Sequence, residues 1–178
     1  MRSSKTHPLQ IGTIIIPETG GRIGLTLCPG KKQPGALTGD WNRDLALDFQ
    51  AIREWNPAVV ISLIEDHEYE ALQVQETAHH LPPGVLYLRM PIPDMSTPDS
   101  DWELNWQLHC PTLLTFLGNG AAIMVHCKGG LGRAGTVAAR LLVEMGTLPE
   151  PAIQQVRDAR PGAIQTRRQA AYVLALRC

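Results

Sequence analysis

The stretch that decides the fold is residues 121–136, A-A-I-M-V-H-C-K-G-G-L-G-R-A-G-T. Its first part is an apolar run typical of a buried strand, and its last part begins an Ala-rich helix. Between them, glycines let the backbone curl so that successive N–H groups point inward. A ring of amides beside the positive end of a helix attracts a dianion. The order strand, loop, helix therefore predicts a phosphate-binding loop.

Two side chains of this loop are candidates for reacting with and binding the anion. Cys127 is expected beneath the bound anion, where the amides and the helix end favour a thiolate, the nucleophilic form of cysteine. Arg133 closes the ring with a planar fork that can pair with two phosphoryl oxygens at once. The alternative is a buried structural cysteine in a glycine turn. We predict that the following consecutive residues bind phosphate: Lys128, Gly129, Gly130, Leu131, Gly132 and Arg133.

The segment resembles the signature of the protein tyrosine phosphatase superfamily, H-C-x5-R followed by a small residue, Gly and Thr. The resemblance implies a cysteine-dependent phosphatase that forms a phosphocysteine intermediate on Cys127. It gives His126 a supporting role, in which the ring bonds to the backbone and holds the loop. Thr136 stands where the family often has Thr. Ala134 is a departure, because family members commonly place a Ser or Thr hydroxyl there to stabilise the departing thiolate.

Transfer of a phosphoryl group to a thiolate requires a proton for the leaving oxygen, so a carboxylic acid is expected on a separate loop. Residues 91–99, P-I-P-D-M-S-T-P-D, follow a predicted strand and are rich in turn formers. We predict Asp94 as this acid, and the resemblance supports it because family loops often read W-P-D. Asp99 and Asp101 are its rivals, of which Asp101 is the predicted N-cap of the next helix.

Two further groups are candidates for the site. The segment R-P-G-A-I-Q-T at 160–166 resembles the family loop that supplies a glutamine, so Gln165 would orient the water that hydrolyses phosphocysteine. The alternative is a solvated turn before the last helix. Glu65 or Asp66, at the end of a buried strand, would brace Arg133 by a salt bridge, unless these carboxylates simply face water.

The rest of the chain alternates predicted strands with predicted helices. Strands are expected at 11–16, 22–27, 58–64, 85–90 and 121–126. Helices are expected at 44–55, 68–81, 102–118, 134–145, 150–159 and 167–177, the last capped by Thr166. This alternation predicts a single α/β domain with a central, mostly parallel mixed sheet of about five strands flanked by helices, the cysteine-based phosphatase fold. We expect residues 1–9 to be a loose N-terminal segment and 10–178 to be the catalytic domain.

The flanking motifs narrow the resemblance to one branch. L-C-P-G-K-K at 27–32 and V-I-S-L-I-E-D at 60–66 make the chain similar to the cyclin-dependent-kinase-inhibitor-3 (kinase-associated phosphatase) branch of dual-specificity enzymes. This implies a phosphorylated protein as substrate, a kinase among the candidates, with phosphotyrosine, phosphoserine or phosphothreonine as the group removed. Phosphoinositide hydrolysis, a phosphate-binding pseudophosphatase and thiol redox chemistry are the alternatives. The redox class depends on the other cysteines: Cys28, Cys110 and Cys178.

Bulk properties exclude several partners. A formal net charge of -1 over 178 residues gives no electrostatic case for nucleic acid. The longest apolar stretches are too short to span a bilayer, so no stable membrane insertion is expected. Scattered cysteines without a paired framework fit a reducing compartment, and we expect a cytoplasmic protein. Neither a metal nor another cofactor is implied, and the sequence leaves the oligomeric state open.

Overall fold

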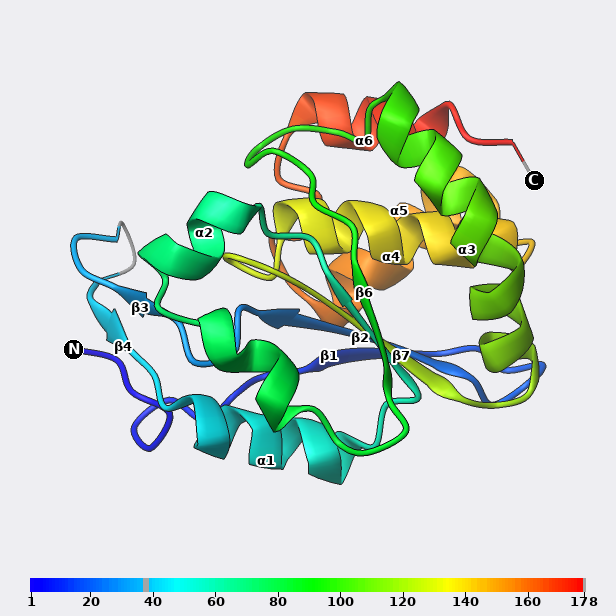
Figure 1. Ribbon diagram of the computed structural model, residues 1–178. Coiled ribbons are helices and arrows are strands. Elements are labelled where there is room, and N and C mark those ends of the chain that lie inside the picture. Colours follow the sequence, from blue (N-terminus) through cyan, green and yellow to red (C-terminus); the bar gives the residue numbers. More distant parts are fainter. Residues whose placement is uncertain (37–38, 178) are drawn as a thin grey trace.

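A five-stranded sheet lies at the centre of the computed structural model, which describes residues 1–36 and 39–177 (Figure 1). The strand order is β1-β2-β7-β5-β6, and β1 is antiparallel to β2 while the other neighbours are parallel. The strands are β1 (Gly12–Ile15), β2 (Arg22–Leu27), β5 (Val59–Ser62), β6 (Leu86–Arg89) and β7 (Ala122–Cys127). All five coincide with predicted strands to within two residues at either end, and the predicted fold class is confirmed.

Helices cover both faces of this sheet (Figure 1). The α-helices are α1 (Leu45–Trp55), α2 (Asp66–Ala71), α3 (Ser100–Gly118), α4 (Gly132–Glu144), α5 (Pro149–Ala159) and α6 (Arg167–Leu174). Thr166 caps α6 as predicted, since its side chain accepts a hydrogen bond from the Gln169 N–H. Among the described residues, no helix combines the length and apolar character needed to cross a bilayer.

Side chains along the buried strands point alternately to the two faces of the sheet, so the core has two layers. Val60 and Met124 face α1 and pack with Phe49 and Ile52, whereas the larger layer, which includes Val125, lies under α3 to α6. The inner strands β5 and β7 are buried along their whole length because they are covered on both sides, whereas the edge strands β1 and β6 are partly exposed. This arrangement leaves the carboxyl ends of β2, β7 and β5 free to present a site at one edge of the sheet.

The region after β5 departs from the prediction. A continuous helix over 68–81 was expected, but the chain forms α2 and then a separate 3₁₀ helix, η1 (Gln75–His80). Gln73 between them has φ of 56°, a left-handed conformation that ends the first helix. Two strands of two residues, β3 (Lys32–Gln33) and β4 (Trp41–Asn42), were not predicted, because so short a pair carries no alternating pattern.

The first seven residues lie against the β3–β4 segment. Arg2 N–H donates to Asp40 O at 2.7 Å, and Asn42 N–H donates to Arg2 O at 2.9 Å. The buried Arg43 guanidinium donates to His7 O at 2.8 Å. These bonds tie the segment that was expected to be loose to residues that flank the start of α1.

Candidate active site

The loop between β7 and α4 lies at the carboxyl end of three parallel strands. Cys127 ends β7 opposite Leu27 of β2, and its preceding residue His126 pairs with Ser62 of β5. Gly130 N–H donates to the Cys127 sulfur at 3.2 Å, so an amide of the loop points at the predicted nucleophile. Gly130 has φ of 69°, and a Cβ there would lie 2.3 Å from the Leu27 nitrogen. Only glycine fits this turn.

Arg133 lies in the first turn of α4 and is buried, with 1% of its surface exposed. Its Nη1 and Nη2 donate to the two carboxylate oxygens of Glu68 at 2.6 and 2.9 Å. Nη1 also donates to the carbonyl oxygens of Leu63 and Ile92. Burial alone would lower the pKa of this guanidinium, but the hydrogen bond to Glu68 raises it. Arg133 is therefore permanently charged, and within the described residues its Nε has no hydrogen-bond partner.

Glu68 is the carboxylate that forms a buried salt bridge with Arg133, a role for which other carboxylates had been predicted. Glu65 is the N-cap residue of α2, and Asp66 pairs with Arg89 on the neighbouring strand. Glu68, one turn further along α2, points back to Arg133 and also accepts the Glu65 N–H at 2.9 Å. Burial would raise the pKa of the Glu68 carboxyl, but the bond from Arg133 lowers it below its ordinary value. The capping box formed by Glu65 and Glu68 marks the start of α2 and does not indicate the contact with Arg133.

Asp94 reaches the same arginine from the loop after β6. Its Oδ1 lies 3.1 Å from Arg133 Nη2, and half of its side chain is exposed. The backbone supports this position, because Met95 N–H donates to Asp94 Oδ1 at 3.0 Å and Met95 adopts a φ of 59°. Asp99 instead caps α3 by accepting the Trp102 N–H. The prediction that Asp101 is this cap was wrong, since Asp101 lies in the first turn of the helix.

Two glutamines from the C-terminal segment contact the other side of the loop. A Cβ on Gly132 would lie 2.8 Å from Gln165 Oε1 and 2.9 Å from Gln169 Nε2, so both amides abut the start of α4. Gln165 is exposed, as a water-orienting group would be. Gln169 is fully buried, and its Nε2 donates to Ser96 O in the Asp94 loop at 3.1 Å. Gln169 was not predicted as a site residue, although Thr166 and Gln169 form a capping box.

The remaining signature residues occupy less direct positions. His126 is buried, and neither ring nitrogen has a hydrogen-bond partner among the described residues, contrary to the expected bond to backbone. Burial and, to a lesser extent, Arg133 lower the pKa of His126 to about 3, so the ring is neutral. Thr136 Oγ1 donates to Gly132 O at 2.9 Å within α4. Ala134 is fully buried and supplies no hydroxyl.

No disulfide links the described cysteines, and Cys178 lies outside the described residues. Cys110 is buried on α3, away from the loop, in the core. Cys28 follows β2 and is buried near Cys127; burial raises the pKa of its thiol, which keeps it protonated. Within residues 1–36 and 39–177, no group of three His, Cys, Asp or Glu side chains is arranged to hold a metal ion.

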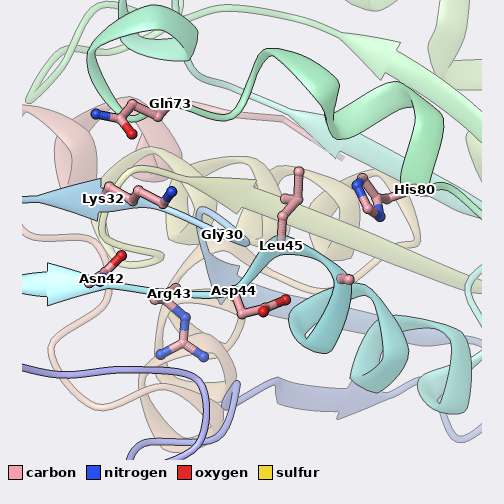
Figure 2. A pocket seen from close by; sticks show the side chains of 9 residues that line it. Gly30, Lys32, Asn42, Arg43, Asp44, Leu45, Gln73 and His80 are labelled. Carbon is pink, nitrogen blue, oxygen red and sulfur yellow. The ribbon is translucent and has the colours of Figure 1, made fainter.

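A separate pocket of about 410 Å³ is lined by residues of β3, β4 and α1 and by Gln73 and His80. Figure 2 shows Lys32, Asn42, Gln73 and His80 around it, whereas Arg43 points away. That arginine forms a buried pair with Asp48, with Nε to Oδ2 at 2.7 Å.

Comparisons with known proteins point to one family. A family model described as "Polymorphic toxin system, DSP-PTPase phosphatase" matches residues 37–147. Cyclin-dependent kinase inhibitor 3 of Rattus norvegicus is 31% identical over 172 residues, covering 93% of this chain and 77% of that protein. Protein tyrosine phosphatase type IVA 3 of Bos taurus is 32% identical over 124 residues, covering 62% and 68%. A crystal structure of kinase-associated phosphatase with its catalytic-site cysteine changed to serine has a TM-score of 0.77 and 27% identity, covering 96% and 98%.

Proposed function

This chain belongs to the DSP-PTPase family of cysteine-based phosphatases, and on that premise we propose that it hydrolyses phosphomonoesters on proteins through a phosphocysteine intermediate at Cys127. The catalytic unit is residues 10–178. Cys127 is the nucleophile, Arg133 and the amides of 128–132 bind the phosphoryl group, Asp94 is the acid and Gln165 orients water.

The observation that carries this proposal is the unpartnered Nε of Arg133. A buried nitrogen donor without an acceptor is costly, and a native protein leaves one only where something else completes it. Glu68 bonds to one hydrogen of Nη1 and one of Nη2, and two carbonyl oxygens also accept from Nη1, so the edge formed by Nε and the second hydrogen of Nη2 is the one that faces a ligand. That edge matches two phosphoryl oxygens, and Cys127 ends the strand that leads into the same loop.

The first chemical step transfers the phosphoryl group. The Cys127 thiolate attacks phosphorus, the bond from phosphorus to the ester oxygen breaks, and Asp94 donates its proton to that oxygen. Asp94 now lies against Arg133 Nη2, 3.1 Å away, where a phosphoryl oxygen would bind. Its half-exposed carboxyl must therefore turn outward toward the leaving group when substrate enters.

The second step releases phosphate. Water attacks the phosphocysteine, Asp94 accepts a proton from that water, and the sulfur–phosphorus bond breaks to restore the thiolate. Gln165 supports this assignment because its exposed amide abuts the loop at Gly132. His126 is left out of proton transfer, because its neutral ring is buried behind the loop.

The names of the relatives support the proposed substrate class. Those named cyclin-dependent kinase inhibitor 3 and kinase-associated phosphatase favour a phosphorylated protein, and a kinase is the first candidate. The free thiols of Cys28, Cys110 and Cys127 support a reducing compartment, and we place the activity in the cytoplasm.

Steady-state hydrolysis of p-nitrophenyl phosphate, phosphotyrosine peptides and phosphothreonine peptides tests the proposal. We expect turnover by the wild type, none by Cys127→Ser, and a loss of about 10²–10³-fold in kcat for Asp94→Ala on peptides. Asp99→Ala, which removes only the helix cap, should keep its kcat. A wild type that binds phosphopeptide without turning over would overturn the proposal in favour of a phosphate-binding module.

A further inference from the structure

Lys31 lies in the turn that joins β2 to β3 and packs against the outer side of the catalytic loop. Gly30 gives the turn its shape, with φ of 71° and a Leu45 side-chain carbon 2.5 Å from the position of a Cβ. Gly30 N–H donates to Asp48 Oδ2 at 2.8 Å, and Asp48 is held by the buried Arg43. These contacts fix the conformation of the turn, and Lys31 therefore has a defined position.

The Lys31 ammonium bonds to the residue that follows the nucleophile. Its Nζ donates to Lys128 O at 3.2 Å, and Cys28 N–H donates to the same oxygen at 3.4 Å. The Lys128 carbonyl and the Gly129 N–H belong to one planar peptide, so a donor that fixes the carbonyl outside the loop also aims that N–H to the opposite side. A cation on the carbonyl polarises the peptide and makes the N–H a stronger donor.

The charge of this lysine has no carboxylate partner. Lys31 is only 4% exposed, and no Asp or Glu among the described residues lies within ion-pair distance of its Nζ. The Trp41 ring lies 4.5 Å away, and the titratable or charged groups that face Lys31 are Cys28, Cys127, Arg43 and Lys128. Burial, the largest effect, lowers the pKa of Lys31 to about 8, while Cys28 and, to a lesser extent, Cys127 oppose this. A buried cation normally has an anion beside it.

We propose that Lys31 is a positioning residue of the phosphate site, which holds and polarises the Lys128–Gly129 peptide and supplies a buried positive charge for the thiolate and the phosphoryl dianion. The inference rests on the proposed function, because it names a further residue of the same site. Lys31 acts from outside the signature loop, on the face away from the bound phosphate.

Competitive inhibition by tungstate, a dianion across the working pH range, measures this effect. Lys31→Met should raise the tungstate inhibition constant about ten-fold at pH 7, as loss of a partly screened charge near the anion requires. Lys32→Met is the matched control, because Lys32 lines the pocket of Figure 2 and should leave the constant within about two-fold. Calorimetric titration of tungstate into Cys127→Ser, with and without Lys31→Met, repeats the comparison without turnover.

The melting temperature and the pH dependence of tungstate binding distinguish this role from a purely structural one. Removal of a buried, unpaired charge should leave the melting temperature of Lys31→Met unchanged or higher, although binding is weaker. Tungstate binding to the wild type should weaken as pH rises through about 8 and beyond, where Lys31 loses its proton. Lys31→Arg should bind tungstate with no such decline. Equal constants for the Met variants of Lys31 and Lys32, or an identical decline in Lys31→Arg, would overturn the inference. A wild type that neither turns over nor binds tungstate would instead refute the proposed function.

Discussion

At the scale of single residues, the signature loop lacks one hydroxyl that its family commonly carries. Ala134 is fully buried directly after Arg133, and the nearby Thr136 hydroxyl is already bonded to Gly132 O. No hydroxyl group in the first turn of α4 is therefore free to stabilise the thiolate when it leaves phosphorus. Breakdown of phosphocysteine is expected to limit turnover.

Ala134→Ser should raise kcat about ten-fold by restoring a donor to the departing thiolate. Rapid-quench measurement of the leaving group released in the first step would show a burst in the wild type and a smaller burst in the variant. Ala138→Ser, one turn further along the same buried helix face, is the control and should not change kcat. A wild type without a burst would contradict slow breakdown of the intermediate.

His126 makes the native state sensitive to acid. Its pKa is lowered from 6.5 to about 3, mainly by burial. Below pH 6.5, the His126 ring is therefore protonated in the unfolded chain but stays neutral in the native chain. Stability is therefore lost as pH falls, by about 1.4 kcal/mol per pH unit for this group. Urea unfolding at pH 7.0 and 5.5 should show a smaller loss for His126→Gln than for the wild type. An equal loss in both proteins would assign the acid sensitivity to other groups.

Residue-scale prediction from sequence succeeded where one short segment holds the information. Cys127 and Arg133 stand in one motif, and Asp94 follows a recognisable strand, so the structure brings all three together as the sequence suggested. Their roles stay predictions. Glu68 and Lys31 were missed because each acts across a tertiary contact, and nothing near them in the sequence marks a partner more than sixty residues away.

At the scale of elements, two helices hold the proposed catalytic groups in place without contributing a proposed catalytic residue themselves. α2 holds the arginine through Glu68, and α6 holds the loop of the acid through Gln169. The correction to the helix in this region has a local cause. Gln73 takes a left-handed conformation that no pattern of apolar residues reveals, so the sequence predicted one helix where α2 and η1 form.

Removal of the Glu68 carboxylate should prevent α2 from holding the Arg133 guanidinium in place. Glu68→Ala leaves the Arg133 charge buried without its carboxylate, which costs about 3–5 kcal/mol of stability. Tungstate binding should also weaken, because the arginine fork is no longer fixed. Chemical denaturation compares this variant with Glu70→Ala, whose side chain is exposed on the same helix. Equal midpoints for the two variants would show that the pair contributes little.

Gln169→Leu should release the acid loop from α6 while leaving the phosphate loop intact. The bond from Gln169 Nε2 to Ser96 O is lost, so Asp94 is less well placed. Substrates with poor leaving groups need the acid most, and we expect kcat/KM to fall about ten-fold or more for alkyl phosphates but little for p-nitrophenyl phosphate. Gln154→Leu, on exposed α5 surface, is the control. A uniform loss across leaving groups would point to a purely structural role.

At the scale of the whole molecule, the site is assembled from five distant parts of the chain. The turn at 28–31, α2, the Asp94 loop, the signature loop and the 160–169 segment all meet at the carboxyl edge of one sheet. The architecture could be predicted because the alternation of strands and helices extends over most of the chain. The order of strands could not, since it depends on pairings between segments far apart in sequence.

The position of β7 between β2 and β5 also governs how the enzyme reaches its active form. Cys127 pairs with Leu27, and its neighbour His126 pairs with Ser62, so both contacts close very large loops. Such non-local pairing slows folding, because chain entropy is lost before the contacts compensate it. After dilution from urea, helical circular dichroism should return first and phosphatase activity only with the slowest phase. A nascent chain therefore cannot join β2 to β5 or form the loop at Cys127 until synthesis has passed β7.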